Sequence, residues 1–256
     1  MPSPSAGRKT CRLDLHGWIS RGPGMLLAEA ERARMDEILP DLFGYHLVQV
    51  GRLGDIDLLS QSRILHKGIV DIDRVPAPAP YPFAYGTAST LPVESDSVDV
   101  IVLPHVLEFD EDPHAALREA FRVLVPEGHL LILGFNPRSP MGMWRPFRKR
   151  RGVAPWNGQF FGVSRIKDWL ALLDFDVTQV QPCFVRPSFG NERWLRTLDA
   201  ICRLGNLTAP VLSTAYLIAA RKRVTRVMSI KTRWRPKPRL VGVGLAEPSA
   251  RIINRE

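Results

Sequence analysis

The sequence predicts an α/β protein with a mostly parallel sheet and helices on both faces. Residues 98–102 and 129–135 are short, almost entirely apolar runs, as expected for strands covered on both sides. Residues 113–124 lie between them, with apolar side chains at helical spacing. Strand, helix and strand with short joins form a right-handed crossover, so the two strands should be parallel. Similar alternation before and after this unit extends the sheet.

Other elements follow from periodicity and from turn residues. Asp112 and Pro113 suit an N-cap and a first helical position, and residues 125–128 (VPEG) suit a type I turn. Pro76, Pro78 and Pro80 exclude a helix before the third strand. The remaining expected strands are 45–50, 68–71, 83–85, 175–180 and 214–220, and the remaining expected helices are 25–39, 55–65 and 165–173, the last capped by Ser164.

Composition narrows the class of protein. The chain has 256 residues, 45% hydrophobic and 24% charged, which is ordinary for a globular domain. No apolar run approaches the ~18 residues of a membrane-spanning helix, and the start lacks the apolar block of a secretory signal. The three cysteines are far apart, without a Cys-x-x-Cys pair. We therefore expect a cytoplasmic protein with no membrane span and no metal site.

The basic charge is concentrated at one end. The net charge is +9, and residues 221–256 hold eleven Lys/Arg against two acidic residues, so this segment carries the whole excess. We expect a flexible lead over 1–16, a domain over 17–220 and a basic, disordered tail over 221–256. Such a tail suits RNA or an acidic partner, or serves only as a solubilising terminus.

Residues 138–162 form a basic and aromatic insertion within the domain, with a run of cations over 145–151. Its composition suits a lid over an anionic small substrate, a loop packed by its own aromatic side chains, or a clamp on nucleic acid. We favour the first two.

The residues suggest a nucleoside site at the carboxyl ends of the strands, where open α/β sheets bind ligands. Gly51 and Gly54 follow the first strand, and glycines allow close backbone approach. Asp71 ends the second strand about twenty residues later, where a carboxylate can accept hydrogen bonds from a ribose diol. Taken alone, this pattern is weak, because most such glycine pairs are turns.

One long segment adds specificity, namely LPVESDSVDVIVLPHVLEFDEDPHAALREAFRVLVPEGHLLILGFNP. It resembles the central signature of the class I S-adenosylmethionine-dependent methyltransferases, most closely the subset called type 11. The resemblance covers residues 45–135 and extends more loosely to 220. It implies a Rossmann-like, seven-stranded sheet, S-adenosylmethionine as cofactor, and methyl transfer to a small or medium-sized acceptor.

The resemblance also implies site residues. Gly51, with Gly54 in the same turn, matches the loop beside the methionine part of the cofactor, and Asp71 matches the acid that holds the ribose. His105 is the best-placed candidate base, although a structural residue bonded to backbone is an alternative that we weigh more heavily. Glu108 and Asp99 are expected to be structural. Thr87 and Ala88 match the adenine side, and Leu103 begins the loop after the fourth strand.

The first glycine motif departs from the family pattern. Gln49 replaces an acid, and Leu53 and Asp55 replace the second and third glycines. Thr87 replaces the acid after the third strand. Loss of two charge-assisted hydrogen bonds and a leucine crowding the turn predict weakened cofactor affinity. A non-catalytic binding protein on the same fold, or an RNA-associated protein using the tail, are therefore the alternatives to an enzyme.

Overall fold

The computed structural model describes residues 14–20, 22–72, 80–143, 145, 154–183 and 213–223. Seven strands form one sheet in the order β3-β2-β1-β4-β5-β7-β6. The pairs from β3 through β5 are parallel, and β7 is antiparallel to both neighbours. This confirms the predicted mostly parallel, seven-stranded sheet. The strands are β1 (His46–Val50), β2 (His66–Asp71), β3 (Phe83–Tyr85), β4 (Val98–Pro104), β5 (Leu124–Phe135), β6 (Phe175–Cys183) and β7 (Ala215–Lys222).

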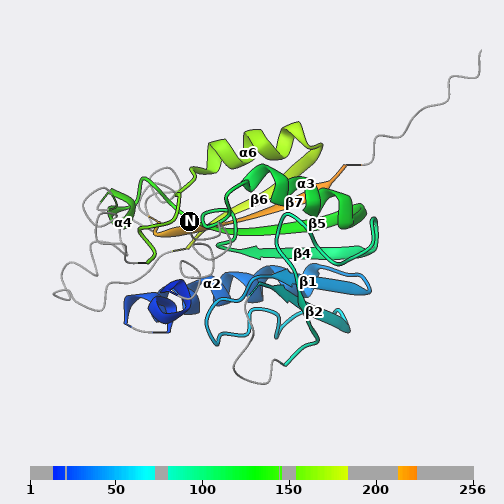
Figure 1. The fold of residues 1–256 in the computed structure, drawn as a ribbon, viewed down its shortest axis with the longest axis horizontal. Helices are drawn as coiled ribbons and strands as arrows, with labels where there is room; N and C mark the ends of the chain where they lie inside the picture. The colour runs from blue at the N-terminus through cyan, green and yellow to red at the C-terminus, as the bar shows by residue number, and fades with distance from the viewer. Residues whose placement is uncertain are drawn as a thin grey trace, which may run out of the picture. The chain divides into compact units, whose positions relative to one another are not determined.

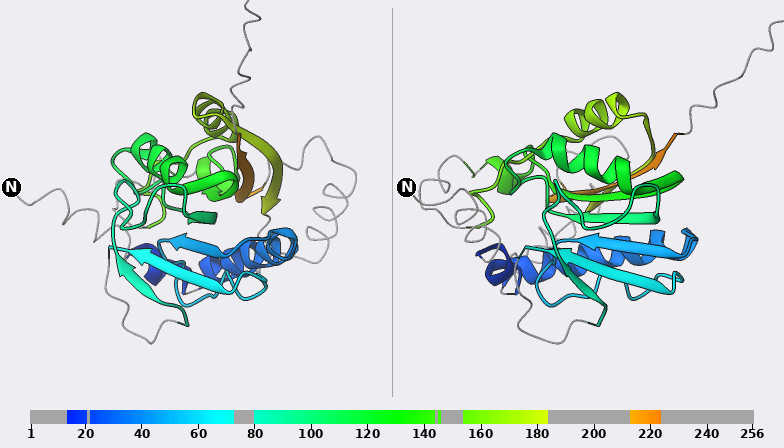
Figure 2. Two further views of the ribbon diagram at one scale, coloured as in Figure 1. Left: turned by 90° about the vertical axis from the view of Figure 1, so that its right-hand side faces the viewer. Right: turned by 45° about the vertical axis from the view of Figure 1, so that its right-hand side comes forward.

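Helices cover both faces of the sheet, as predicted (Figures 1 and 2). Helix α2 packs its buried side chains into the core of one face, and α3 and α6 pack theirs into the core of the other. Alternate residues of the central strands divide between these two cores, which explains why β4 and β5 are apolar throughout. The helices are α2 (Pro23–Ile38), η1 (Leu39–Asp41), α3 (Pro113–Val123), α4 (Pro140–Met143) and α6 (Val163–Leu172).

Helix α3 shows how the sequence determines the central unit. Asp112 accepts a hydrogen bond from the Ala115 N–H at 2.9 Å, and Pro113 occupies the first turn, so the predicted cap is confirmed. Ala116, Leu117 and Ala120 are buried against the sheet. The helix ends directly at β5 (Leu124–Phe135), which already includes residues 125–128, where a type I turn was predicted. There the β4–β5 register shifts and Glu127 has φ 66°, so these residues form an irregular start of the strand instead.

The segment between β1 and β2 differs from the prediction. Residues 51–65 contain turns and no helix. Asp57 accepts from the Leu59 N–H and Ser62 from the Ile64 N–H, and such local bonds compete with helix formation. Leu58, Leu59 and Ile64 are nevertheless buried, so packing rather than helical hydrogen bonding fixes this segment.

Three boundaries also change. Helix α6 begins at Val163 after Gly162, with no side-chain cap, so Ser164 is not its N-cap. A helical segment already covers 14–19, so the lead is shorter than predicted. Strand β7 runs to Lys222, which places the first tail cations in the domain. Residues 1–13 and 224–256 lie outside the described residues, as do the predicted flexibility of the lead and disorder of the tail.

Lys222 fixes the end of β7 to α3 and β5. Its Nζ donates to Asp96 at 2.7 Å, to the Phe121 carbonyl at 2.8 Å and to the Leu124 carbonyl at 2.6 Å. Arg221 and Arg223 form ion pairs with Glu127 and Asp176. All three cations are thus engaged within the domain.

Candidate methyl-transfer site

The carboxyl ends of β1, β2 and β3 are joined by backbone hydrogen bonds. The Gly51 N–H donates to the Val70 carbonyl at 2.7 Å, and the Gly86 N–H donates to the Asp71 carbonyl at 3.1 Å. Gly51 has φ 82°, a conformation that favours glycine. The turn after β1 and the ends of β2 and β3 therefore meet at one edge of the sheet.

Asp71 is the carboxylate of this edge. It is 3% exposed, and its two oxygens accept from the backbone N–H groups of Arg52 at 2.8 Å and Ile72 at 2.7 Å. Backbone donors of this kind fix the orientation of the carboxylate. Asp71 is thus held at the position where the sequence predicts a ribose-binding acid.

The first turn is arranged differently from the prediction. Leu53 is fully buried in the core on the α2 face, so it does not crowd the turn. Gly54 donates its N–H to His16 Nδ1 at 3.0 Å, and a Cβ there would lie 3.1 Å from the Ile19 side chain. Gly54 thus packs against the helical segment 14–19, and the structure does not favour it as a cofactor contact. Gln49 is buried and donates to the Gly51 carbonyl at 2.8 Å, so it supports the turn.

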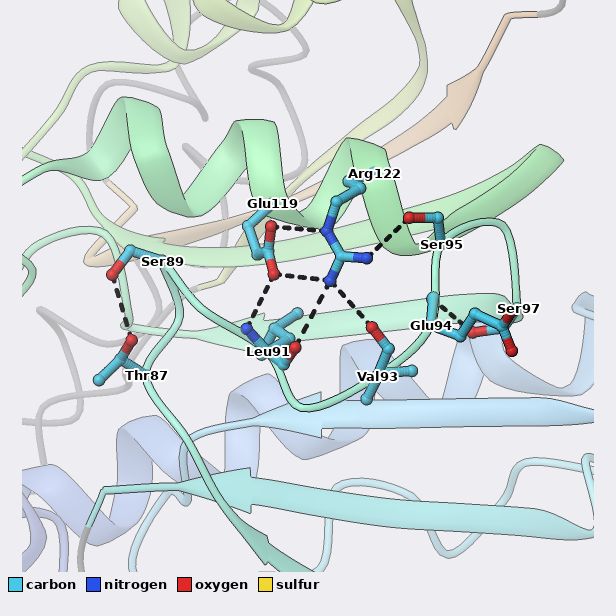
Figure 3. A network of polar contacts seen from close by, with 9 residues as sticks. All are labelled: Thr87, Ser89, Leu91, Val93, Glu94, Ser95, Ser97, Glu119 and Arg122. Atoms are coloured by element: carbon cyan, nitrogen blue, oxygen red, sulfur yellow. Dashed lines mark hydrogen bonds and ion pairs between the residues drawn. The ribbon is translucent and has the colours of Figure 1, made fainter.

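The loop between β3 and β4 carries the predicted adenine side. Thr87 is half-buried with Oγ1 3.2 Å from Ser89 Oγ, whereas the Ala88 side chain belongs to the core. Figure 3 shows how α3 holds this loop: Glu119 accepts from the Leu91 N–H, and Arg122 binds both Glu119 oxygens and the Val93 carbonyl. Only Thr87 of this pair therefore has a side chain outside the core.

A charged cluster follows β4. His105 is fully buried, with Nε2 2.8 Å from Glu31 of α2 and Nδ1 3.3 Å from Glu108. Glu108 also accepts from the Phe135 N–H at 2.7 Å, and the His105 ring stacks on Phe135 with centroids 4.0 Å apart. Leu103, just before this loop, has its side chain in the core, so only its backbone is available to a ligand.

The protonation of His105 disfavours a role as base. Burial lowers its pKa, but Glu31 and Glu108 together outweigh that effect and raise the pKa to about 10. An imidazolium that donates from both nitrogens has no lone pair with which to accept a proton. The structural alternative, which the sequence favoured over a general base, therefore accounts better for His105, with two carboxylates as its side-chain partners. Sequence patterns could not reveal Glu31, because it is 74 residues away from its partner.

Aromatic side chains from three segments gather beside this cluster. Phe135 contacts Trp18 edge to face and stacks on Phe160, and Trp18 also meets Trp156. Trp156 and Phe160 belong to the insertion, so its described part packs on the end of β5 through its aromatic side chains. Asp99 lies away from this cluster and accepts from the Tyr45 and His46 N–H groups, which confirms its structural role.

A separate, small pocket that is open to solvent lies beside the first turn. It contains Gln49, Arg52 and Tyr81 but not Asp71, so it is not the predicted ribose position. The Tyr81 hydroxyl donates to Asp57 at 2.9 Å, and burial and this carboxylate raise the pKa of Tyr81 to about 12.

Comparison with known proteins agrees with this geometry. A family model described as a methyltransferase domain matches residues 67–132. The uncharacterized protein YafS of Escherichia coli K12 is 32% identical over 200 residues, covering 78% of each chain. The chain belongs to the class I methyltransferase family. This family takes S-adenosylmethionine as its cofactor.

Solved structures show the same fold as this chain. One is a SAM-dependent methyltransferase of Thermotoga maritima, described as a possible histamine N-methyltransferase, with TM-score 0.54 and 20% identity over 77% of this chain and 92% of the other. Another, from Archaeoglobus fulgidus, has TM-score 0.54 and 17% identity over 76% of this chain and 94% of the other. Among the described helices of the chain, none has the length and hydrophobicity needed to cross a bilayer.

The residues of this chain fit the family's cofactor at some positions and not at others. Asp71, the Gly51 turn and Thr87 lie at the carboxyl edge, where ribose, methionine and adenine groups would be held. Gly54 is turned to the helical segment, and Ala88 and Leu103 offer only backbone. The fit is thus carried by one acid, one glycine turn and the end of β3.

Proposed function

We propose that the protein binds S-adenosylmethionine at the carboxyl ends of β1 to β4 and transfers its methyl group to a small or medium-sized acceptor. The main support is Asp71, a buried carboxylate fixed beside the Gly51 turn by the Arg52 N–H at 2.8 Å. Orienting this acid before the ligand arrives lowers the cost of binding.

The cofactor supplies a methyl group that its sulfonium already activates, so the protein needs no nucleophile. Asp71 would accept hydrogen bonds from the ribose hydroxyls, and Gly51 would let the backbone approach the methionine part. Thr87 would border the adenine. Their contribution to rate is alignment of the acceptor with the methyl carbon and exclusion of water.

Calorimetric titration with S-adenosylmethionine and S-adenosylhomocysteine tests the cofactor site. Asp71→Ala should weaken binding by about 1–3 kcal/mol, because it removes a charged acceptor. Asp41→Ala is the matched control, since Asp41 is exposed in η1 and carries the same charge. Absence of heat with wild-type protein at millimolar cofactor would overturn the proposed function. Equal affinity of Asp71→Ala and wild type would overturn the ribose assignment alone.

A non-catalytic binding protein is the second candidate. Two observations favour it: Gln49 stands where the family has an acid, and residues 51–65 contain no helix after the glycine turn. This candidate predicts no methyl transfer to any acceptor even when cofactor binds. Product analysis for S-adenosylhomocysteine after incubation with a cell extract separates the two candidates.

RNA association through the tail is a third candidate. It is supported by the eight Lys/Arg of residues 224–256, since Arg221, Lys222 and Arg223 are already engaged within the domain. Salt-sensitive retention on RNA is the expected behaviour, and the truncation that tests it is given in the Discussion.

A further inference from the structure

Glu31, His105 and Glu108 form a buried cluster that connects α2, the loop after β4 and the end of β5. Glu31 lies on α2, His105 and Glu108 follow β4, and Glu108 also binds the N–H of Phe135 at the end of β5. All three side chains are at most 2% exposed. His105 is the central member, because each of its ring nitrogens faces one carboxylate.

Burying this cluster raises the free energy of the folded state unless the imidazole is charged. Two buried carboxylates without a cation would repel each other in a medium of low dielectric constant. One oxygen of each, Glu31 Oε2 and Glu108 Oε2, is buried without a hydrogen-bond partner among the described residues. A fold retains such a group when its position serves a site as well as packing.

The backbone conformation of His105 is also unusual. His105 has φ 49°, in the left-handed region that side-chain-bearing residues seldom adopt. Its N–H donates to the Leu133 carbonyl at 3.0 Å, so the left-handed residue turns the chain immediately after β4. Strained residues of this kind persist where neighbouring groups hold them, and they concentrate at functional sites.

We propose that Glu31 is a positioning residue of the methyl-transfer site, acting through His105 to fix the turn after β4 that borders the cofactor. The inference rests on the proposed function, because it concerns the same site. Glu31 reaches this turn from α2, so the helix and the site are mechanically coupled.

The experiment is a double-mutant cycle in S-adenosylhomocysteine affinity, using wild type, Glu31→Gln, His105→Asn and the double variant. Asparagine tolerates the left-handed conformation, so His105→Asn removes the ring without forbidding the turn. Glu29→Gln is the matched control, being an exposed glutamate of the same helix. Glu31→Gln should weaken binding about tenfold, since it removes one charged hydrogen bond. In the His105→Asn background the same change should have no effect.

A pH profile separates positioning from simple packing. Between about pH 6 and pH 8 the wild-type affinity should be constant, whereas that of Glu31→Gln should fall as His105 loses its proton. The other titratable groups nearby are Cys183 of β6, beside Glu31, and Tyr216 of β7, beside Glu108. Burial raises the pKa of both, so they remain neutral in this range. Imidazole NMR shifts should show His105 titrating in the variant and not in wild type.

Each outcome decides the proposal. Equal affinities of Glu31→Gln and wild type at both pH values, or additive effects of the two substitutions, would overturn it while leaving cofactor binding intact. If Glu31→Gln does not fold, wild type, His105→Asn and the double variant, which removes acid and ring together, are compared. Weaker binding by His105→Asn with no further loss in the double variant supports the proposal. Wild-type affinity of His105→Asn, or a further loss in the double variant, refutes it. Wild-type protein that fails to bind S-adenosylhomocysteine at all would overturn the proposed function and this inference together.

Discussion

Lys222 makes the strongest single polar anchor in the described part of the chain. Lys222→Met should lower the free energy of unfolding by about 1–3 kcal/mol, because it leaves the buried Leu124 carbonyl and the partly buried Phe121 carbonyl without this donor. Urea denaturation measures the change. Arg223→Met is the control, since this side chain is 64% exposed and exposed ion pairs contribute little. An equal decrease in the free energy of unfolding in Lys222→Met and Arg223→Met would show that Lys222 contributes no more than an exposed ion pair.

His105 links stability to pH. Its folded pKa, about 10, lies above its unfolded value, so its contribution is complete below about pH 6.5 and is lost as pH rises toward 10. We expect the free energy of unfolding of wild type to fall between pH 6.5 and 8 by at most about 1.4 kcal/mol per pH unit. The fall should be absent in His105→Asn. If the free energy of unfolding of wild type and of His105→Asn changed equally with pH, the His105 ring would not be charged in the folded protein.

Asp71, Glu31 and Leu53 differ in how far the sequence alone indicates where their side chains lie. Asp71 was predictable, because it ends an apolar strand at a fixed distance from the glycine turn. Glu31 was not, since on α2 it has the spacing of any helical glutamate and its contact with His105 appears only when α2 packs against the sheet. The same holds for Leu53, whose direction depends on how the turn meets the core.

At the scale of elements, α3 holds the loop before β4 through Glu119 and Arg122 (Figure 3). Glu119→Ala removes the acceptor of the Leu91 N–H, so hydrogen exchange at this amide should become faster by about tenfold, matching the loss of one charge-assisted bond. NMR-detected exchange measures it. Arg118→Ala on the exposed side of α3 should leave the Leu91 rate unchanged. An unaltered rate in Glu119→Ala would mean that the loop is held by packing alone.

The elements that were predicted correctly share a strong local signal. β4, α3 and β5 combine apolar periodicity with an Asp-Pro cap, and each lies within a few residues of its expected range. The predicted helix over 55–65 was wrong because Leu58, Leu59 and Ile64 are buried by tertiary packing, while Asp57 and Ser62 bind nearby backbone. In so short a segment, the spacing of apolar residues does not distinguish a helix from a series of turns with buried side chains.

For the whole molecule, the boundary between domain and tail can be tested by truncation. A chain ending at Arg223 should unfold at the same temperature as wild type, because it retains Lys222 and its partners. A chain ending at Ala220 should be less stable by several degrees, since it loses Lys222 and the end of β7. Differential scanning calorimetry compares them. Equal transition temperatures of the chains ending at Ala220 and at Arg223 would show that residues 221–223 do not stabilise the domain.

The Arg223 truncation also tests the RNA hypothesis. It removes eight cations without touching the domain, so retention on an RNA column at low salt should be lost if the tail binds RNA. Unchanged retention would remove that hypothesis and leave a solubilising terminus.

The place of β7 has a consequence for synthesis. It is the last of the described strands to leave the ribosome, yet it lies inside the sheet, with β5 on one side and β6 on the other. Until residue 222 has emerged, the nascent chain presents the apolar edge of β5 unpaired, which invites self-association. Chaperone dependence during translation should therefore be confined to the interval before the final strand appears, and a circular permutant that supplies this strand first should shorten it.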